Sequence, residues 1–433
     1  MEEVYQYLWK HRMWHWEGTK LVDGRDFELL DPGCQNLDAG PDFFNGKIKV
    51  DGVEWAGNIE IHVKASDWYR HGHDRDLGYS NVVLHVVAVD DARISRHDGS
   101  EVPQVVMTFP KQFFNVYSRL AAETPALRCS GRLGDIDSLT MTDWLESLAI
   151  ERLQEKANRI TGILDATEGD WEQACFATLA RGLGFGLNAE PFEMLGRNVP
   201  LKIASRHCDD IFQLEAILFG QAGMLDPSAE IFNEYYQGLC REYGFLLRKY
   251  GLRPFPASYW KYARTRPQNF PHRRIALLAK TLEGGFQLLR NLLEAQCDVE
   301  ELRSLFAWRL SGYWHDHFSF SREAKVASDA LSDSSINLLL INVVAPLYYA
   351  YGSLRAMPQI ADRALELLSL LPAENNTVVR QWSAAGVKAD DACRSQALLQ
   401  LTRQYCEPRK CMYCRIGHKL LRIAAKPEAL CTY

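Results

Sequence analysis

The chain has 433 residues, of which 47% are hydrophobic and 24% are charged, and its formal net charge at pH 7 is −6. This composition is that of a globular protein and excludes an intrinsically disordered one, while the length allows two or three domains. The acidic balance excludes a protein that coats nucleic acid by bulk electrostatic attraction, although a local basic cleft is compatible with it.

The start of the chain and its most apolar stretch bear on its location. Residues 1–5 include two glutamates and lack the basic and apolar runs of a secretory signal, so we expect a cytoplasmic protein. The most apolar stretch, residues 336–351, is shorter than the roughly 20 residues that cross a bilayer. We expect no membrane contact and interpret this stretch as a buried helix that ends near Pro346. The eleven cysteines then favour free thiols or a metal site over a disulfide framework.

The first 118 residues contain short strand-like runs between turn signals, after an amphipathic helical opening. We expect strands at residues 27–30, 47–50, 53–65, 81–89 and 105–109, with a turn or helix at 67–79. Asp51-Gly52 marks a hairpin turn between two of these strands. These signals predict an α/β domain with a mixed sheet over residues 1–118.

Beyond about residue 119 the apolar period changes from two to about 3.6, which is typical of helices. The period predicts a mostly α-helical region at residues 119–433, with a Cys-containing subdomain at about 390–433. The whole chain is then of the α+β class. We expect the helical region to offer a surface for a protein partner.

A group of polar residues falls on the strand expected at 53–65. Because successive side chains of a strand point to opposite faces, Glu60, His62 and Lys64 share one face. Such a row is costly to bury unless its members are paired or bind a ligand. Asp42 precedes a neighbouring strand, and two carboxylates placed in this way suit Mg²⁺ or Mn²⁺, which prefer oxygen ligands. We therefore expect Asp42 and Glu60 to bind one of these ions.

These residues resemble the signature of the PD-(D/E)XK phosphodiesterase superfamily, a Pro-Asp at one strand and an acid-x-Lys on the next. Pro41-Asp42 matches the first acid, Glu60 matches the second, and His62 stands where the superfamily has lysine. The resemblance implies a core of helix, three antiparallel strands, helix and strand, with nuclease activity. In that case Asp42 and Glu60 would hold the metal, and His62 or Lys64 would orient the attacking water or contact the phosphate.

A longer string of residues resembles a bacterial family of uncharacterised proteins, a domain of unknown function. The string runs from Gly40-Pro41-Asp42-Phe43 through Glu60-Ile61-His62-Val63 to His71-Gly72-His73 and Leu84-His85-Val86-Val87. This second resemblance implies no activity.

A second group of possible metal ligands follows the strand at 53–65. His71 and His73 form a His-x-His pair near Asp76, and imidazole is a common ligand of Zn²⁺ and Mn²⁺. A zinc hydrolase centred on His71, His73 and Asp76 is therefore an alternative, as is a solvated polar loop. His85 lies within an otherwise apolar strand, so we interpret it as a core histidine.

Cys406, Cys411 and Cys414 are spaced as C-x4-C-x2-C near the C-terminus. Three soft ligands at this spacing suit a zinc site or an iron–sulfur cluster, which His418, Cys431 or Cys393 would complete. Buried thiols without a metal are the competing interpretation.

A basic, aromatic-rich segment lies at residues 259–274. Its cations suit contact with the phosphates of DNA or RNA, and they also suit a loop held by arginine hydrogen bonds. The cations that we consider for nucleic-acid contact are Lys261, Arg264, Arg266, Arg273 and Arg274.

The sequence therefore supports three hypotheses about function. The first is a Mg²⁺- or Mn²⁺-dependent phosphodiesterase or nuclease that uses Asp42, Glu60 and a basic residue. The second is a binding or scaffold protein of the same fold without catalysis, favoured by the histidine at the lysine position. The third is the zinc hydrolase.

Overall fold

The computed structural model describes residues 2–109, 111–122, 127–231, 233–263, 265–295, 297–324 and 328–426. The chain divides into two units, of which unit 1 comprises residues 1–142 and 403–433 and unit 2 comprises residues 143–402. Unit 1 is thus built from two separate parts of the sequence. The division at residue 142 and the return at residue 403 differ from the single boundary at 118 expected from the change in period.

Unit 1 contains a mixed sheet with the spatial order β1-β3-β4-β5-β6, and a short β2 pairs with β3. The strands are β1 (Phe27–Asp31), β2 (Cys34–Gln35), β3 (Phe43–Val50), β4 (Val53–Lys64), β5 (Val82–Val89) and β6 (Gln104–Val106). The pairs β1–β3 and β3–β4 are antiparallel, whereas β4–β5 and β5–β6 are parallel. The prediction of an N-terminal mixed sheet is confirmed.

Local sequence explains how β3, β4 and β5 come to be neighbours. Asp51 and Gly52 both have positive φ (46° and 83°), which lets a two-residue turn join β3 to β4 as an antiparallel hairpin. The apolar β5 is buried over its first six residues, as expected of a strand covered on both faces. Between β4 and β5 the chain crosses over through α2 (Asp67–Arg70) and the 3-10 helix η1 (Leu77–Tyr79), which makes these two strands parallel.

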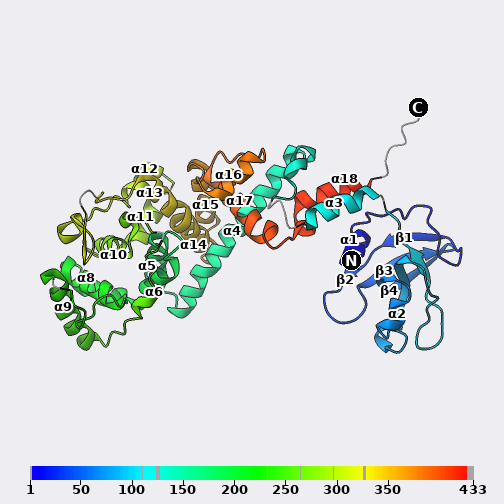
Figure 1. Cartoon of the computed structure of the whole chain (residues 1–433), viewed down its shortest axis with the longest axis horizontal. Coiled ribbons are helices and arrows are strands. Elements are labelled where there is room, and N and C mark those ends of the chain that lie inside the picture. The colour runs from blue at the N-terminus through cyan, green and yellow to red at the C-terminus, as the bar shows by residue number, and fades with distance from the viewer. Residues whose placement is uncertain are drawn as a thin grey trace. The chain divides into compact units, whose positions relative to one another are not determined.

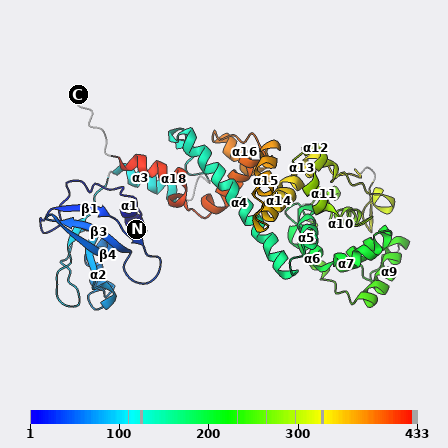
Figure 2. The ribbon, with the colours of Figure 1, turned by 180° about the vertical axis from the view of Figure 1, so that it is seen from behind.

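Helices from both ends of the chain complete unit 1. These helical elements include α1 (Glu2–Lys10), α3 (Lys111–Ala121), η2 (Ser130–Asp135), the short η9 (Cys411–Tyr413) and α18 (Arg415–Ala425). In Figures 1 and 2, α18 lies beside α3, although about 300 residues separate them in the sequence. Leu421 of α18 is fully buried in the same apolar cluster as Trp9 of α1 and Ile59 of β4. Helix α18 is therefore part of the core of unit 1.

Among its described residues, unit 2 has one small hairpin, β7 (His317–Ser319) with β8 (Arg322–Glu323), and its other named elements are helical, so the prediction of a mostly helical C-terminal part is confirmed. Most of its side chains that point inward form one large apolar cluster. The helices are α4 (Ser138–Ala166, which begins in unit 1), α5 (Trp171–Leu183), α6 (Ala189–Asn198), α7 (Leu201–Ala204), α8 (Ile211–Gln221), α9 (Glu234–Tyr250), α10 (Pro271–Lys280), α11 (Leu288–Glu294), α12 (Val299–Ser304), α13 (Asp333–Leu339), α14 (Ala345–Leu354), α15 (Pro358–Leu370), α16 (Thr377–Ala384) and α17 (Ala392–Leu401).

The most apolar helical segment, Asp333–Leu354, is long and apolar enough to cross a membrane, but 67% of its most apolar window is buried inside the protein. It is thus placed like a core helix. The expectation that it ends near Pro346 is wrong, because a π-helical turn, Leu340–Val344, precedes the proline and the helix continues as α14. A widened turn accommodates a residue that has no N–H to donate to the preceding turn. Within α14, Gly352 lies so close to α15 that a Cβ atom there would be 2.2 Å from the backbone nitrogen of Ala361.

Candidate metal centre

Two carboxylates meet at the beginning of β3 and the middle of β4. The backbone N–H of Asp42 donates to Glu60 Oε2 (3.1 Å), and the backbone N–H of Ile61 donates to Asp42 Oδ2 (2.9 Å). Gln6 of α1 donates from Nε2 to Asp42 Oδ1 (2.7 Å). Each carboxylate therefore caps the backbone of the other strand, and both are held in fixed positions.

The environment of this pair disfavours two negative charges. Glu60 is only 4% exposed, and burial raises its pKa. Burial also raises the pKa of Asp42, and the adjacent charge of Glu60 raises it further. A nearby cation would remove this repulsion.

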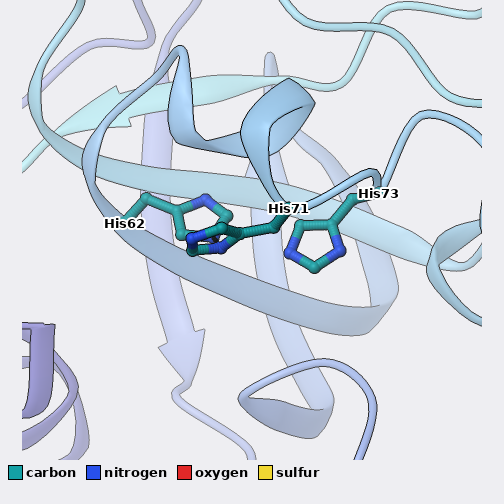
Figure 3. A group of neighbouring side chains, drawn as sticks. All are labelled: His62, His71 and His73. Carbon is teal, nitrogen blue, oxygen red and sulfur yellow. Dashed lines mark hydrogen bonds between the residues drawn. The ribbon is translucent and has the colours of Figure 1, made fainter.

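Three histidines lie beside Glu60, with ring nitrogens within 4.8 Å of one another. Figure 3 shows that His62 comes from the strand whereas His71 and His73 come from the segment after α2, with the three rings close together. Glu60 Oε1 lies 3.5 Å from His62 Nε2 and 3.3 Å from His73 Nε2. Within the described residues, His73 Nε2 is buried without a hydrogen bond of good geometry. An oxygen and two nitrogens thus converge on one point.

A chain of hydrogen bonds fixes the tautomer of His62. The amide nitrogen of Gln104 donates to Asp90 Oδ1 (3.2 Å) and to the carbonyl of Ala92 (3.1 Å), so its Oε1 is the atom that faces His85 Nδ1 (3.0 Å). His85 must therefore carry its proton on Nδ1 and accept at Nε2, which lies 2.8 Å from His62 Nδ1. Burial lowers the pKa of both histidines, that of His85 to about 4, so both are neutral.

The consequence of this relay is a lone pair on His62 Nε2. That nitrogen accepts a hydrogen bond from His71 Nδ1 (3.1 Å) and also faces Glu60 Oε1 and Glu2 Oε1 (3.7 Å). A cation bound to this lone pair would replace the His71 proton and compensate the two carboxylates. Orientation of a metal-binding histidine by a hydrogen bond to its other ring nitrogen is the usual arrangement in metal sites.

Comparison with family models gives one match, to the family described as "Protein of unknown function (DUF2851)", over residues 2–377. The chain belongs to this family. The expectation of a family of uncharacterised proteins is thereby confirmed. Comparison with curated proteins and with solved structures finds no match. The matched range contains Asp42, Glu60 and the three histidines, and it ends before Cys406.

Two residues expected at the site have other surroundings. Lys64 is exposed at the end of β4, and its backbone N–H donates to Asp67 Oδ2 (3.2 Å). Asp76 is exposed, and its Oδ1 accepts a hydrogen bond from the backbone of Gly78 (2.8 Å) as the cap of η1. Asp76 is thus engaged as a helix cap, and it is not among the residues grouped around His62, His71 and His73.

The cations of the basic segment divide into two kinds. Arg273 is 1% exposed and donates to the carbonyls of Trp314, His317 and Ser328, and Arg274 is also buried. These two guanidinium groups are used inside unit 2 and are not presented to a phosphate. Lys261 and Arg266 are exposed, and Arg264 lies outside the described residues.

Sequence reasoning missed Glu2 and Gln6 of α1 and Gln104 of β6 as neighbours of the site. Glu2 and Gln6 are four residues apart, which places both side chains on one face of a helix. This spacing was the sequence signal that could have linked the two residues to each other. Burial raises the pKa of Glu2, as it does for the two strand carboxylates. Gln104 carried no signal, because a glutamine at a strand start is common on protein surfaces.

Proposed function

We propose that this chain is a metal-dependent phosphodiesterase that hydrolyses nucleic acid. The observation that carries the proposal is the meeting of the buried carboxylates of Asp42 and Glu60 beside ring nitrogens of His62 and His73. Adjacent buried carboxylates are costly unless a proton or a cation compensates them. One divalent cation would compensate both, which supports a metal centre at this point.

The donor atoms fit a cation that accepts both carboxylate oxygen and imidazole nitrogen. Mg²⁺ prefers oxygen alone, whereas Mn²⁺ and Zn²⁺ also bind imidazole. We therefore propose Mn²⁺ as the ion, held by Asp42, Glu60, His62 and His73. When bound, such an ion polarises the scissile phosphate and lowers the pKa of a bound water.

The other polar groups have roles that follow from their exposure. His71 is exposed and its Nδ1 lies 3.1 Å from His62 Nε2, so it can orient the attacking water from the solvent side. Lys64 is exposed two residues beyond His62 on the same strand, and we assign it to contact with the substrate phosphate. His62, as a metal ligand, has a different role from the lysine of the PD-(D/E)XK signature.

The arrangement of unit 1 supports a PD-(D/E)XK type of core. Helix α1 is followed by the antiparallel strands β1, β3 and β4, then by α2 and by β5, which is parallel to β4. This is the order that the resemblance implies, with the two acids at the start of β3 and within β4. The zinc hydrolase is less well supported, because Asp76 caps η1.

The test is a hydrolysis assay on the full chain after removal of metal with EDTA and reloading with Mn²⁺ or Mg²⁺. Labelled single- and double-stranded DNA and RNA are the substrates. We expect Asp42→Asn and Glu60→Gln to lower cleavage by about 100-fold or more, the order of effect seen when a group that acts on the reacting water is lost. Glu54→Gln, on the exposed part of the same strand, is the matched control and should retain activity.

Thermal unfolding of each variant separates loss of chemistry from loss of the fold. Cleavage that survives both site substitutions would refute the two-carboxylate mechanism. A wild-type protein that binds Mn²⁺ but cleaves none of the four substrates would refute the enzyme and leave a metal-binding scaffold.

A further inference from the structure

Four cysteines from two distant segments of the sequence come together in unit 1. Cys129 directly precedes η2, whereas Cys406, Cys411 and Cys414 lie in the segment between α17 and α18. Cys129 and Cys411 pack against the same apolar cluster of unit 1, and Cys414, three residues beyond Cys411, is buried. The two segments that carry the cysteines are thus neighbours in the fold.

Backbone contacts hold the two segments together at this point. Arg128, the neighbour of Cys129, donates from Nη1 to the carbonyl of Cys406 (2.7 Å). The backbone N–H of Cys414 donates to the carbonyl of Cys411 (3.3 Å), which turns these two residues toward the same side. Gly417 allows this turn to pack against α18, because a Cβ atom there would lie 2.0 Å from the Cys411 carbonyl oxygen. The positions of the thiols are therefore set by the fold.

The charge around the thiols is positive. Arg128 is only 6% exposed, and its guanidinium also approaches the Cys411 thiol. Among the residues that the structure describes, no carboxylate forms an ion pair with Arg128. A small cavity beside Cys129 is lined by Arg119, Arg128 and Arg132, of which Arg132 is paired with Asp135 (2.7 Å). A buried guanidinium is costly without a negative partner. Four thiolates around a divalent ion carry a net charge of about −2 and would supply that partner.

We propose that Cys129, Cys406, Cys411 and Cys414 bind a thiolate-preferring metal centre, either a single Zn²⁺ or an iron–sulfur cluster. The spacings C-x4-C and C-x2-C within the C-terminal segment fall in the range that such sites use. The fourth ligand is Cys129, in place of His418, Cys393 or Cys431 considered from the sequence. His418 is engaged through Nδ1 with the hydroxyl of Tyr7 (2.7 Å).

The role of this centre is structural, and it is separate from the proposed phosphodiesterase site. Binding replaces the four thiol protons by metal–sulfur bonds and joins the segment around residue 129 to the segment at 406–414. It thereby fastens the C-terminal part of unit 1 to the N-terminal part. None of the four cysteines forms a disulfide with another described residue.

The experiment measures the metal content of the full chain, purified without added metal and without oxygen. We expect about one zinc per chain, or iron with sulfide and visible charge-transfer absorbance. Cys129→Ser and Cys411→Ser should each lower the content about tenfold, because a missing thiolate opens the site. Cys34→Ser, an exposed cysteine of β2 in the same unit, is the matched control. Glu60→Gln should keep this metal, which separates the result from the histidine–carboxylate centre.

A second measurement needs no variant and therefore does not depend on folding of a mutant. The folded wild type is treated with a thiol reagent before and after removal of the metal by a strong chelator. Four additional thiols should react after chelation. A wild type without zinc or iron, a metal content unchanged by Cys129→Ser, or equal thiol reactivity before and after chelation would each overturn the proposal.

Discussion

Replacement of Gln104 by methionine tests whether the hydrogen-bond relay behind His62 prepares a metal ligand. Gln104 is 6% exposed and lies outside the proposed ligand set, so the change leaves every ligand in place. Methionine has a similar length and no hydrogen-bond acceptor of comparable strength. The substitution removes the acceptor that holds the proton on His85 Nδ1, together with the amide N–H groups that donate to Asp90 and to the carbonyl of Ala92.

The size of the effect follows from the burial of His85, which is fully buried. A proton left on His85 Nδ1 without an acceptor costs about 1–3 kcal/mol. Transfer of that proton to Nε2 avoids this cost, but His85 then donates to His62 Nδ1 and forces the proton of His62 onto its own Nε2. The lone pair that faces Glu60 is lost in this tautomer. Metal binding must reverse this tautomer shift of His85 and His62. We therefore expect the affinity for Mn²⁺ to fall about 10–100-fold.

The assay is calorimetric titration of EDTA-treated protein with Mn²⁺ at neutral pH. Gln35→Met is the matched control, since Gln35 lies in β2 of the same unit and its side chain accepts a hydrogen bond from exposed Lys10 (3.0 Å). The Gln104→Met protein without metal should remain folded but be about 1–3 kcal/mol less stable, because Asp90 Oδ1 and the carbonyl of Ala92 lose their donor. A folded Gln104→Met variant that binds Mn²⁺ as tightly as the wild type would refute the relay.

Two further predictions concern unit 2. Glu215 accepts a hydrogen bond from the Tyr235 hydroxyl and is 5% exposed, and burial raises its pKa to about 7 from an ordinary 4.5. The folded state then keeps a proton that the unfolded state releases, so stability falls as pH rises between these two values. Glu215→Gln should be more stable than the wild type by up to about 3 kcal/mol near pH 8 and about equal near pH 4, by urea unfolding. An equal difference in unfolding free energy at both pH values would contradict a raised pKa of Glu215 in the folded state. Gly352→Ala should destabilise the packing of α14 on α15 by about 1–3 kcal/mol. Gly244→Ala, in α9 with open space around it, should be neutral or stabilising by up to about 1 kcal/mol, and the reverse order of the two melting temperatures would exclude this packing argument.

The elements of the fold that local signals determine were predictable from the sequence. The Asp51-Gly52 turn fixed the β3–β4 hairpin, and the apolar residues of β5 indicated its burial on both faces. The return of α18 to unit 1 was not predictable, because an amphipathic helix reveals which face is apolar but not which partner covers it. The continuation of a helix past Pro346 was missed because a π-helical turn has no clear local signature.

The candidate site was predictable to the extent that it depends on the period of one strand. Alternation placed Glu60 and His62 on one face of β4, as the structure has them. The position of Asp42 depends on the register of β3 and β4, in which Phe43 pairs with Ile59. The Asp51-Gly52 turn predicted that these two strands form a hairpin. Gln104 reaches the site from a strand two positions further along the sheet. Such a contact depends on tertiary structure that no local pattern contains.

The discontinuity of unit 1 has a consequence for the order of folding during synthesis. Helix α3 emerges from the ribosome early, but its partner α18 follows only after the whole of unit 2, residues 143–402, has been made. At about 5–20 residues per second this interval is on the order of tens of seconds. During it, α3 lacks the helix that packs against it in the folded protein, while unit 2 progressively acquires the whole of its own sequence. Unit 1 therefore begins to be synthesised before unit 2 and can be completed only after it.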